Sequence, residues 1–252
     1  MWNLHSYDDF FLKDKKLSVV LPAYNEGARL FGNALEVNRA IGEFAADYEV
    51  ILVNDGSSDN TFHEAMRARQ LDPKHIKVIS YSNNRGKGGA IKIGVQKAKG
   101  ELIAFLDSDL DLSPLHLRGF VCELLKNDAD IVIGSKLHKE SKVDYPAIRR
   151  ITSYGYYIML KLLFRLNTKD TQTGIKLYRA DVIKPIIKNI MTRGYAFDIE
   201  ILASAAKDKR KIVEMPVEVI YTRNTTGSGS RIRIKDIIRM FSDTIHIKRK
   251  LR

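Results

Sequence analysis

The sequence contains a single cysteine, Cys122, in 252 residues. One thiol excludes an intrachain disulfide and a cysteine-based zinc site, so we expect a cytosolic protein rather than one adapted to an oxidising compartment. No uncharged apolar run approaches the roughly 20 residues that a bilayer-spanning helix needs. The polar, acidic start, with Asn3, Asp8 and Asp9, does not resemble a signal peptide. We expect a chain that neither spans a membrane nor is secreted by an evident route.

Several catalytic motifs are also missing. None of the six histidines forms an HExxH pair and no serine lies in a GxSxG elbow, which leaves zinc-protease and serine-hydrolase functions without support. The glycine-rich segment 84–90 (NRGKGGA) fits neither the Walker A spacing nor the dinucleotide fingerprint, because Ile91 stands where the third glycine would be. The segment precedes a predicted helix, however, and can present backbone amides and the Lys87 ammonium to a phosphate.

Positive charge is abundant and confined to two segments. The formal net charge is +12, of which residues 136–169 carry +6 and residues 223–252 carry +7, so the remainder is close to neutral. Such a distribution is typical of a surface that meets a polyanion, either nucleic acid or an anionic membrane. The alternative is that both segments are solvated helices, but both also carry apolar stripes.

The first half of the chain alternates short β-branched runs with helical stretches, which is typical of βαβ units. The apolar runs predict buried parallel strands over 17–21, 49–53, 76–80, 102–106 and 131–133. The stretches between them predict helices over 26–41, 60–69, 88–98 and 115–126. This alternation predicts an α/β fold with a doubly wound, mostly parallel sheet and flanking helices. We expect a last strand over 213–222.

Polar clusters follow four of the predicted strands. They are the segments 22–26 (PAYNE), 54–59 (NDGSSD), 107–111 (DSDLD) and 134–136 (GSK). Ligands of doubly wound sheets bind beyond the carboxyl ends of the strands, so we expect the four clusters to converge on one crevice.

Three carboxylates, those of Asp107, Asp109 and Asp111, alternate after an apolar strand. They would repel one another without a cation, and hard oxygen ligands suit Mg²⁺ or Mn²⁺, which in turn bridge the oxygens of a diphosphate. The alternative is an acidic turn before the helix that Ser113 and Pro114 open. The position at the carboxyl edge favours the metal site.

The segments VVLPAYNE, VNDGSSDNT, NRGKGGAI, FLDSDLD and GSK occur in this order. Together they resemble the nucleotide-diphosphosugar domain of inverting GT-A glycosyltransferases of family two. Further on, DTQTGIKLYRADVI (170–183) and YAFDIEILASA (195–205) resemble the polyprenyl-phosphate hexose synthases, which are the dolichyl-phosphate glucose and mannose synthases. The resemblance covers about residues 17–245 and implies the GT-A fold. The DTQ-G-KL-R pattern is more similar to the glucose enzymes.

The resemblance implies roles on the nucleotide side of the site. Pro22, Tyr24 and Glu26 would line the ribose and base, and Asp55 would read the base edge. Asn54 stands where relatives often have a second aspartate, which leaves the base preference open. The glucose-type DTQTGIKLYR segment implies UDP-glucose as the favoured donor, with GDP-mannose as the alternative.

The same resemblance assigns the acidic cluster and its neighbours. Asp107 would hold the nucleotide, while Asp109 and Asp111 would bind Mg²⁺ or Mn²⁺; some mannose synthases have glutamine at the last of these positions. Lys87 and Gln172 complete the expected substrate-binding residues.

On the acceptor side, the resemblance implies that Lys136, Arg149 and Ser153 hold the phosphate of a polyprenyl or dolichyl acceptor. Arg223 and the Ser230-Arg231 pair would close over the sugar diphosphate. With Asp109, the residues Lys136, Arg149, Ser153, Arg223 and Arg231 form the expected catalytic set.

Two amphipathic segments fit a membrane surface. Residues 147–166 hold an apolar and aromatic stretch broken by Lys161 and Arg165, and the C-terminal segment places Ile234, Ile238 and Ile245 among basic residues. These features predict interfacial helices that bury apolar side chains at the acyl boundary while lysine and arginine extend to the headgroups. The alternative is that both stripes pack on the sheet. We expect a peripheral protein on the cytoplasmic face of a membrane, with a separate membrane-anchor subunit as a candidate partner.

The acceptor determines the chemistry. A phosphate monoester is already an anion near neutral pH and can attack the anomeric carbon without an enzymic base, so positioning and leaving-group stabilisation suffice. A glycan or protein hydroxyl would need a base, for which Asp198 is the candidate. A nucleic-acid-binding α/β protein is the non-enzymatic alternative, against which stand the acidic cluster and the lack of a recognisable DNA- or RNA-binding motif.

The expected organisation is one continuous catalytic unit. Residues 1–16 form an N-terminal arm, 17–222 the catalytic domain with the interfacial region at about 145–167, and 223–252 the basic C-terminal amphipathic helix. A flexible-looking segment, 225–230 (TTGSGS), follows the last predicted strand.

Overall fold

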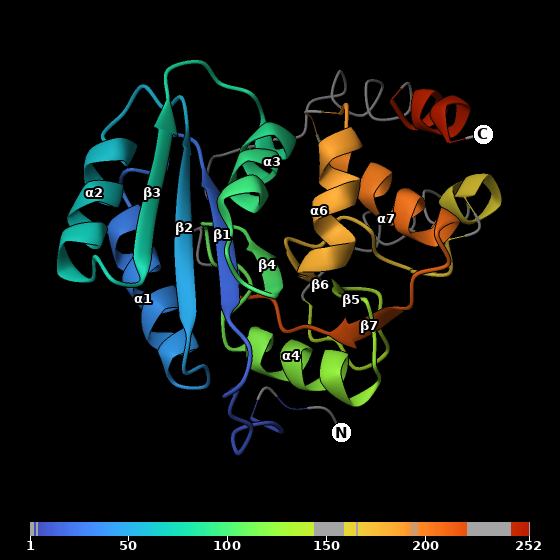
Figure 1. Ribbon diagram of the computed structural model, residues 1–252, viewed down its shortest axis with the longest axis horizontal. Coiled ribbons are helices and arrows are strands. Elements are labelled where there is room, and N and C mark those ends of the chain that lie inside the picture. Colours follow the sequence, from blue (N-terminus) through green and yellow to red (C-terminus); the bar gives the residue numbers. More distant parts are fainter. Residues whose placement is uncertain are drawn as a thin grey trace.

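The computed structural model describes residues 3, 5–143, 159–164, 166–192, 194, 196–220 and 243–251. They form a sheet with helices on both faces (Figure 1). Its strands are β1 (Leu17–Ala23), β2 (Tyr48–Asp55), β3 (Ile76–Tyr81), β4 (Leu102–Leu106), β5 (Ile131–Ser135), β6 (Ile175–Arg179) and β7 (Ile212–Pro216). The labelled helices are α1 (Leu30–Gly42), α2 (Thr61–Leu71), α3 (Lys87–Lys97), α4 (His116–Lys126), α6 (Ala180–Asn189) and α7 (Phe197–Lys207). Residues 159–164 and 243–250 are also helical.

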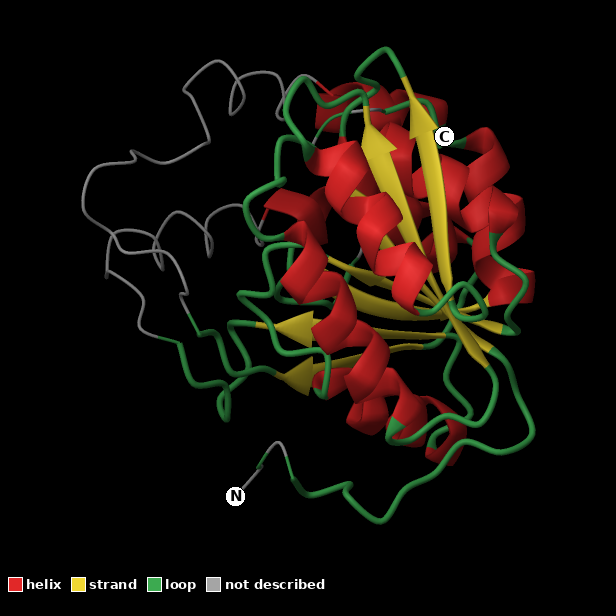
Figure 2. Ribbon diagram, turned by 90° about the vertical axis from the view of Figure 1, so that its left-hand side faces the viewer, coloured by secondary structure: helices red, strands yellow, loops and turns green. Residues whose placement is uncertain are grey.

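The strand order is β3-β2-β1-β4-β6-β5-β7. Strand β6 is antiparallel to both of its neighbours, β4 and β5, whereas the other pairs are parallel. The sheet is therefore mostly parallel, as the sequence predicts. The carboxyl ends of β1, β2, β4 and β5 lie at one edge, where the amino end of β6 joins them. Figure 2 shows the strong twist of this sheet between its two helical layers.

Side chains alternate between two cores on opposite faces of the sheet. Val19 and Leu21 of β1 pack with α1, α2 and α4, whereas Val20 packs with α3, α6 and α7. Strands β2 and β4 alternate in the same way, and all of their residues are buried. Strands that are apolar on both faces are stable only when helices cover both sides, which explains the doubly wound arrangement.

Two boundaries and one set of elements differ from the sequence prediction. The first helix starts at Leu30 rather than at residue 26, because the preceding residues bond to the neighbouring loop: the amide of Glu26 donates to Thr61 Oγ1 at 2.9 Å. Strand β7 ends at Pro216, earlier than predicted, and Val219 then forms an isolated bridge with Leu112. The predicted set also lacked β6, α6 and α7, which occupy the two segments that were identified only by resemblance.

A buried histidine joins the start of α4 to the segment that follows β7. The Nδ1 atom of His116 lies 2.8 Å from the carbonyl oxygen of Ser113, and the amide of Glu218 donates to Nε2 at 3.0 Å. Nδ1 therefore carries the proton and Nε2 accepts, which fixes the neutral tautomer. Burial lowers the pKa of His116 below its usual value near 6.5, and the Ser113 carbonyl and the Glu218 charge only partly offset this effect.

This arrangement predicts a loss of stability in mild acid. In the unfolded chain His116 takes up a proton as the pH falls below about 6.5, whereas the folded chain keeps it neutral to lower pH. The free energy of unfolding should therefore decrease below about pH 6.5. Denaturant unfolding of the wild type and of His116→Gln between pH 7.5 and 5 measures the effect, since the variant should lose this component. An identical decline in both proteins would contradict the prediction.

Candidate functional site

The loops after β1 and β2 are held together by hydrogen bonds at the carboxyl edge. The Asn25 amide donates to Ser57 Oγ at 3.0 Å, and the Ser58 amide donates to Asn25 Oδ1 at 3.0 Å. The Gly27 amide donates to Asp59 Oδ2 at 3.1 Å. Asn25 has a positive φ of 53°, which asparagine tolerates better than most residues. Two of the four predicted polar clusters therefore form a single structure, from which the Tyr24 side chain projects with 48% of its surface exposed.

Asp55 is buried at the end of β2 and organises the glycine-rich loop. Its Oδ1 accepts the Tyr81 hydroxyl at 2.7 Å and the Arg85 amide at 2.8 Å. Its carbonyl oxygen accepts the Asn84 side-chain amide at 3.0 Å. Burial and this carboxylate raise the pKa of Tyr81, while the Arg85 guanidinium lies over the Tyr81 ring at 4.9 Å. Asp55 thus shapes the segment that leads into α3.

A lysine from α3 pairs with the first carboxylate of the acidic cluster after β4. Lys87 Nζ lies 2.5 Å from Asp107 Oδ1, and both side chains are partly exposed. Burial opposes the charged form of Lys87, but the carboxylates of Asp107, Asp198 and Asp109 outweigh it and raise the pKa of Lys87. Lys87 also begins α3, where free amides favour an anion. The structure therefore joins the glycine-rich loop to the acidic cluster.

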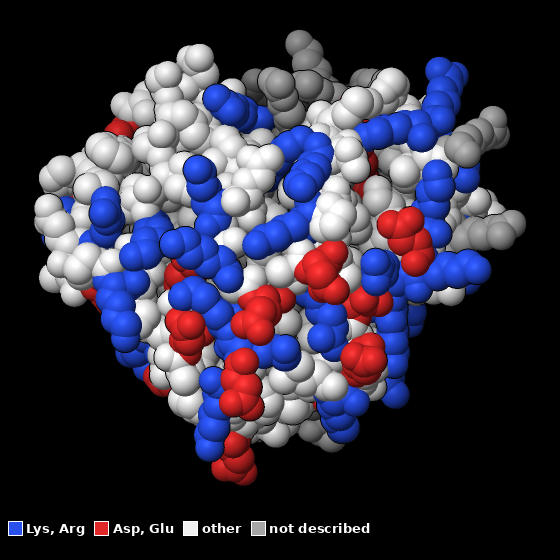
Figure 3. Space-filling view, in the orientation of Figure 1, with Lys and Arg blue, Asp and Glu red and all other residues white. Residues whose placement is uncertain are grey.

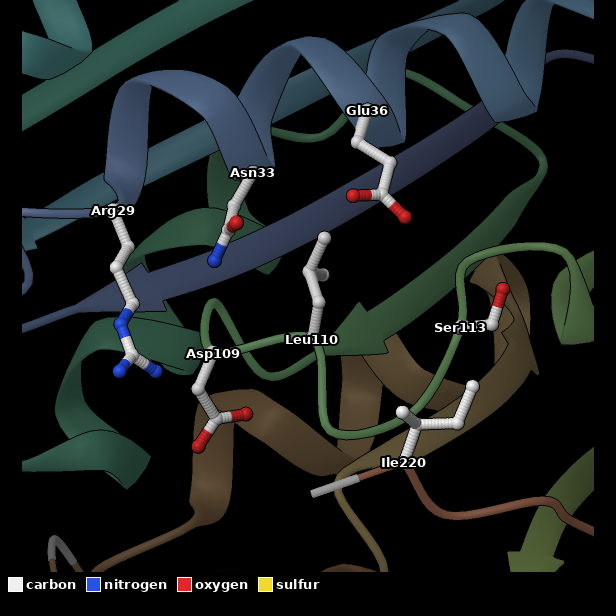
Figure 4. A pocket seen from close by; sticks show the side chains of 7 residues that line it. All are labelled: Arg29, Asn33, Glu36, Asp109, Leu110, Ser113 and Ile220. Atoms are coloured by element: carbon white, nitrogen blue, oxygen red, sulfur yellow. The ribbon is translucent and has the colours of Figure 1, made fainter. Parts of the chain in front are cut away.

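The loop after β4 turns sharply beside helix α1. Leu110 has a φ of +54°, and the Asp111 amide points to Asp109 Oδ1 at 3.4 Å. Asn33 of α1 fixes the loop by donating to the Ser108 carbonyl oxygen at 2.7 Å. Between this loop and α1 lies a cavity of ≈ 330 Å³ (Figure 4). It is lined by Arg29, Asn33, Glu36, Asp109, Leu110, Ser113 and Ile220.

The residues of this loop suit a hard divalent cation that is completed by a substrate. Among the residues that the structure describes, no three His, Cys, Asp or Glu side chains come together as a metal-binding group. Asp109 and Asp111 supply only oxygen donors, which Mg²⁺ and Mn²⁺ prefer. Mg²⁺ is commonly bound by one or two carboxylates together with substrate phosphates rather than by a full protein cage. The donor set therefore fits a cation that arrives with a nucleoside diphosphate.

The loop before β6 links the acidic cluster to the end of β5. Asp170 accepts the Lys136 amide on Oδ2 at 3.0 Å and the Gln172 amide on Oδ1 at 3.1 Å. At the other end of the loop, the Gly174 carbonyl oxygen accepts the Asp107 amide at 3.1 Å. A Cβ on Gly174 would overlap the Asp107 carboxylate. The polar clusters after β4 and β5 are thus joined through this loop.

Behind the site lies a buried ion pair. Lys176 Nζ of β6 lies 2.7 Å from Asp198 Oδ1 in the first turn of α7, with side-chain exposures of 2% and 6%. Lys176 also donates to the Thr173 carbonyl oxygen at 2.6 Å. Burial raises the pKa of Asp198, although Lys176 and Lys87 oppose this shift. The Asp198 carboxylate is therefore inside the protein and paired.

The predicted site residues fall into two groups. The structure describes the predicted residues up to Lys136 and also Gln172. It brings Asp107 together with Lys87 and joins Lys136 to Gln172 through Asp170. Four predicted residues lie outside the described residues, namely Arg149, Ser153, Arg223 and Arg231. Sequence reasoning did not assign roles to Asp170, Gly174 and Lys176. Their signal was the DTQTGIK segment, which carries all three.

Comparison with known proteins identifies the group to which these motifs belong. Residues 18–187 match the family described as Glycosyl transferase family 2. A dolichyl-phosphate beta-glucosyltransferase of Saccharomyces cerevisiae is 29% identical over 92% of this chain and 74% of its own length. The ALG5D dolichyl-phosphate beta-glucosyltransferase of Trichomonas vaginalis is 32% identical over 92% of this chain and 72% of its own length. A human dolichyl-phosphate beta-glucosyltransferase is 33% identical over 81% of this chain and 67% of its own length.

Solved structures share the fold. Glucosyl-3-phosphoglycerate synthase from Mycobacterium tuberculosis, in complex with Mn²⁺, UDP and glucosyl-3-phosphoglycerate, matches with a TM-score of 0.69. The match covers 99% of this chain and 84% of that chain at 19% identity. The same enzyme with UDP alone has a TM-score of 0.69 over 100% and 84% of the two chains. The α/β architecture predicted from the sequence, with its mostly parallel sheet, is confirmed as the GT-A fold.

The packing at Gly174 predicts a site that tolerates no side chain there. Gly174→Ala should displace the Asp107 carboxylate from Lys87, because the added Cβ occupies its position. We expect at least about tenfold weaker binding of a nucleoside diphosphate with Mn²⁺, which corresponds to about 1.4 kcal/mol. Isothermal titration calorimetry measures this binding.

Gly32→Ala is the matched control. Gly32 lies inside α1 and its added Cβ would meet no atom within 4 Å. Alanine in a helix interior is favoured over glycine by roughly 0.5–1 kcal/mol, so this variant should be slightly more stable and bind normally. Wild-type affinity in Gly174→Ala would contradict the prediction.

Proposed function

Because the chain belongs to Glycosyl transferase family 2 and is a glycosyltransferase, we propose that it transfers glucose from UDP-glucose to a polyprenyl or dolichyl phosphate. The acidic cluster paired with Lys87 is the observation that carries the proposal, since it offers a cation site and a phosphate-binding lysine together. The dolichyl-phosphate beta-glucosyltransferases named above support glucose as the sugar and a lipid phosphate as the acceptor. These matches favour the enzyme over the nucleic-acid-binding alternative.

The nucleotide would bind across the carboxyl ends of β1, β2 and β4. Tyr24 is exposed there and Pro22 and Glu26 flank it, which suits stacking and hydrogen bonding to base and ribose. Asp55 is 97% buried by its own loop and would present its second carboxylate oxygen to the base. The mycobacterial neighbour, which shares the fold, was crystallised with UDP, which supports a uridine nucleotide as the ligand.

The residues after β4 and at the start of α3 would stabilise the leaving group. Asp109 and Asp111 would hold Mg²⁺ or Mn²⁺, which when bound supplies positive charge to the departing diphosphate. Lys87 can move its ammonium from Asp107 to a phosphate oxygen without leaving the site. The free amides at the start of α3 add further donors to the same anion.

The acceptor proposal is supported by the environment of Asp198. A hydroxyl acceptor needs a base in hydrogen-bond reach, whereas Asp198 is buried and engaged with Lys176. A phosphate acceptor needs cations instead, and Lys136, held by Asp170 at the end of β5, is available at the same edge. Arg149 and Ser153 are proposed as its partners. Attack by a phosphate oxygen on the face opposite the leaving group would invert the anomeric configuration.

A membrane-facing surface is proposed around the two short helical segments. Ile247 of segment 243–250 and Leu160 of segment 159–164 are buried against α7, while Leu162 and Ile245 are 78% and 52% exposed. Each segment therefore packs on α7 and also exposes an apolar side chain, which supports the proposed membrane-facing surface. Lys and Arg gather over α3 and α6 on the face shown in Figure 3. No described helix is long and apolar enough to span a bilayer, and we propose peripheral binding at the cytoplasmic face.

An assay of glucosyl transfer tests the function. The protein is incubated with labelled UDP-glucose, a short polyprenyl phosphate and Mn²⁺ or Mg²⁺, and the labelled lipid is detected by chromatography. The wild type should form the product, whereas Asp109→Asn should lose turnover and cation-dependent donor binding while keeping its fold, because it removes a carboxylate ligand. Wild-type rates in excess chelator would overturn the metal assignment. Selective thermal stabilisation by GDP rather than UDP would overturn the donor assignment.

Exposed apolar side chains should govern vesicle binding. Leu162→Glu/Ile245→Glu should weaken association with anionic vesicles at least about tenfold, because two apolar side chains no longer enter the acyl boundary. UDP affinity should be unchanged. Vesicle co-sedimentation measures the effect.

Leu71→Glu is the control for this variant, since Leu71 is 65% exposed at the end of α2. It should leave vesicle binding intact. An equal loss of vesicle binding in both variants would show that the two helical segments do not form the membrane-facing surface.

A further inference from the structure

Four charged side chains of alternating sign connect into a ring at the carboxyl edge. Asp107 after β4 pairs with Lys87 of α3 at 2.5 Å, and Lys176 of β6 pairs with Asp198 of α7 at 2.7 Å. The charges of Lys87 and Asp198 interact across the gap between the pairs, each shifting the pKa of the other. The backbone of residues 173–174 links the two pairs on the other side. Lys176 donates to the Thr173 carbonyl oxygen, and the Gly174 carbonyl oxygen accepts the Asp107 amide.

Only part of this ring can touch a ligand. Lys87 and Asp107 are 28% and 37% exposed, whereas Lys176 and Asp198 are 2% and 6% exposed. The inner pair joins β6, the strand that begins beside Asp107, to the first turn of α7. Helix α3 also packs directly on α7 here, since a Cβ on Gly88 would overlap Phe197, the neighbour of Asp198.

Core packing alone does not account for the inner pair. Removing two charges from water is costly, and buried ion pairs can often be replaced by apolar side chains of similar volume without loss of stability. Both side chains of the pair are almost fully buried, and so is the neighbouring Tyr178 on the same strand, so little water screens the two charges. A charge in such surroundings acts strongly on its neighbours.

We propose that Lys176 and Asp198 are positioning residues for the transfer reaction. Asp198 lies in the first turn of α7, which packs on the first turn of α3 at Phe197 and Gly88, and its negative charge helps to hold the Lys87 ammonium beside Asp107. Lys176 holds the Thr173–Gly174 backbone against Asp107. Neither side chain touches the substrate. This inference rests on the proposed function only for the identity of the donor, and it assigns to Asp198 a role other than that of a base.

The test removes both charges at once. Lys176→Met/Asp198→Leu should unfold at a denaturant concentration near that of the wild type, because neither charge is left unpaired. Its affinity for UDP with Mn²⁺ and its kcat/KM for UDP-glucose should each fall at least tenfold. Lys176→Arg keeps the cation and the donor to Thr173 and should stay within threefold of the wild type. Wild-type binding and turnover in the double variant would overturn the proposal.

A second variant and a control complete the design. Lys176→Gln/Asp198→Asn keeps the shape and hydrogen bonding without the charges, and it replaces the apolar double variant if that protein does not fold. Arg179→Met/Asp128→Asn removes an ion pair of 2.8 Å at the far end of the same strand and should leave UDP affinity unchanged. Equal losses in this control would show a general effect on β6 and overturn the proposal.

One readout needs no substrate. The pH midpoint for acetylation of Lys87 by acetic anhydride, followed by mass spectrometry, should shift downward in the double variants and stay constant in the control. An unchanged midpoint would overturn the coupling between Asp198 and Lys87. A wild type that binds UDP without glucosylating polyprenyl phosphate would overturn the proposed function alone, since the binding and acetylation measurements still report on the pair.

Discussion

Compensation of negative charge at one edge of the sheet is the constraint on which this molecule depends. Parallel strands deliver Asp55, Asp107 and the carboxylates beyond them to the same place, and these groups repel one another unless cations lie between them. The protein supplies Lys87 and Lys176 from two different elements, α3 and β6. The ammonium group of each lysine pairs with a carboxylate, that of Asp107 or of Asp198. The site is therefore assembled by charge as well as by topology.

Strand β6 makes this assembly possible because it runs against its neighbours. A strand parallel to β4 would bring its carboxyl end, and hence the start of a loop, to the site. The antiparallel strand brings its amino end instead, so Lys176 is held in the ladder between Phe105 and Ile133, and Gly174 directly precedes Ile175, which pairs with Leu106. Lys176, which contacts Asp198, thus lies on regular structure, where side-chain positions are well defined.

The sequence predicted the first half of the fold well because its signals are local. The β-branched runs of β1, β2 and β4 are buried on both faces, and the polar clusters after them are joined by short-range geometry at the sheet edge. The antiparallel β6 was not predicted, since a short apolar run does not reveal its direction or its partner strand. Asp198 shows the same limit within the site. Its sequence position suggested a base, whereas its pairing with Lys176 depends on a contact between β6 and α7 that no local pattern encodes.

The long connection between β5 and β6, residues 136–174, is a place where such enzymes can change without loss of the fold. The chain leaves the sheet at Ser135 and returns at Ile175, and the two strands pair directly with each other. The entropy cost of closing a loop rises only with the logarithm of its length, so insertions and replacements within this connection are inexpensive. Its two ends are fixed by Asp170 and by the Gly174 contact with Asp107. A new recognition surface can therefore be grafted between these ends while the half of the fold built on β1, β2 and β3 stays unchanged.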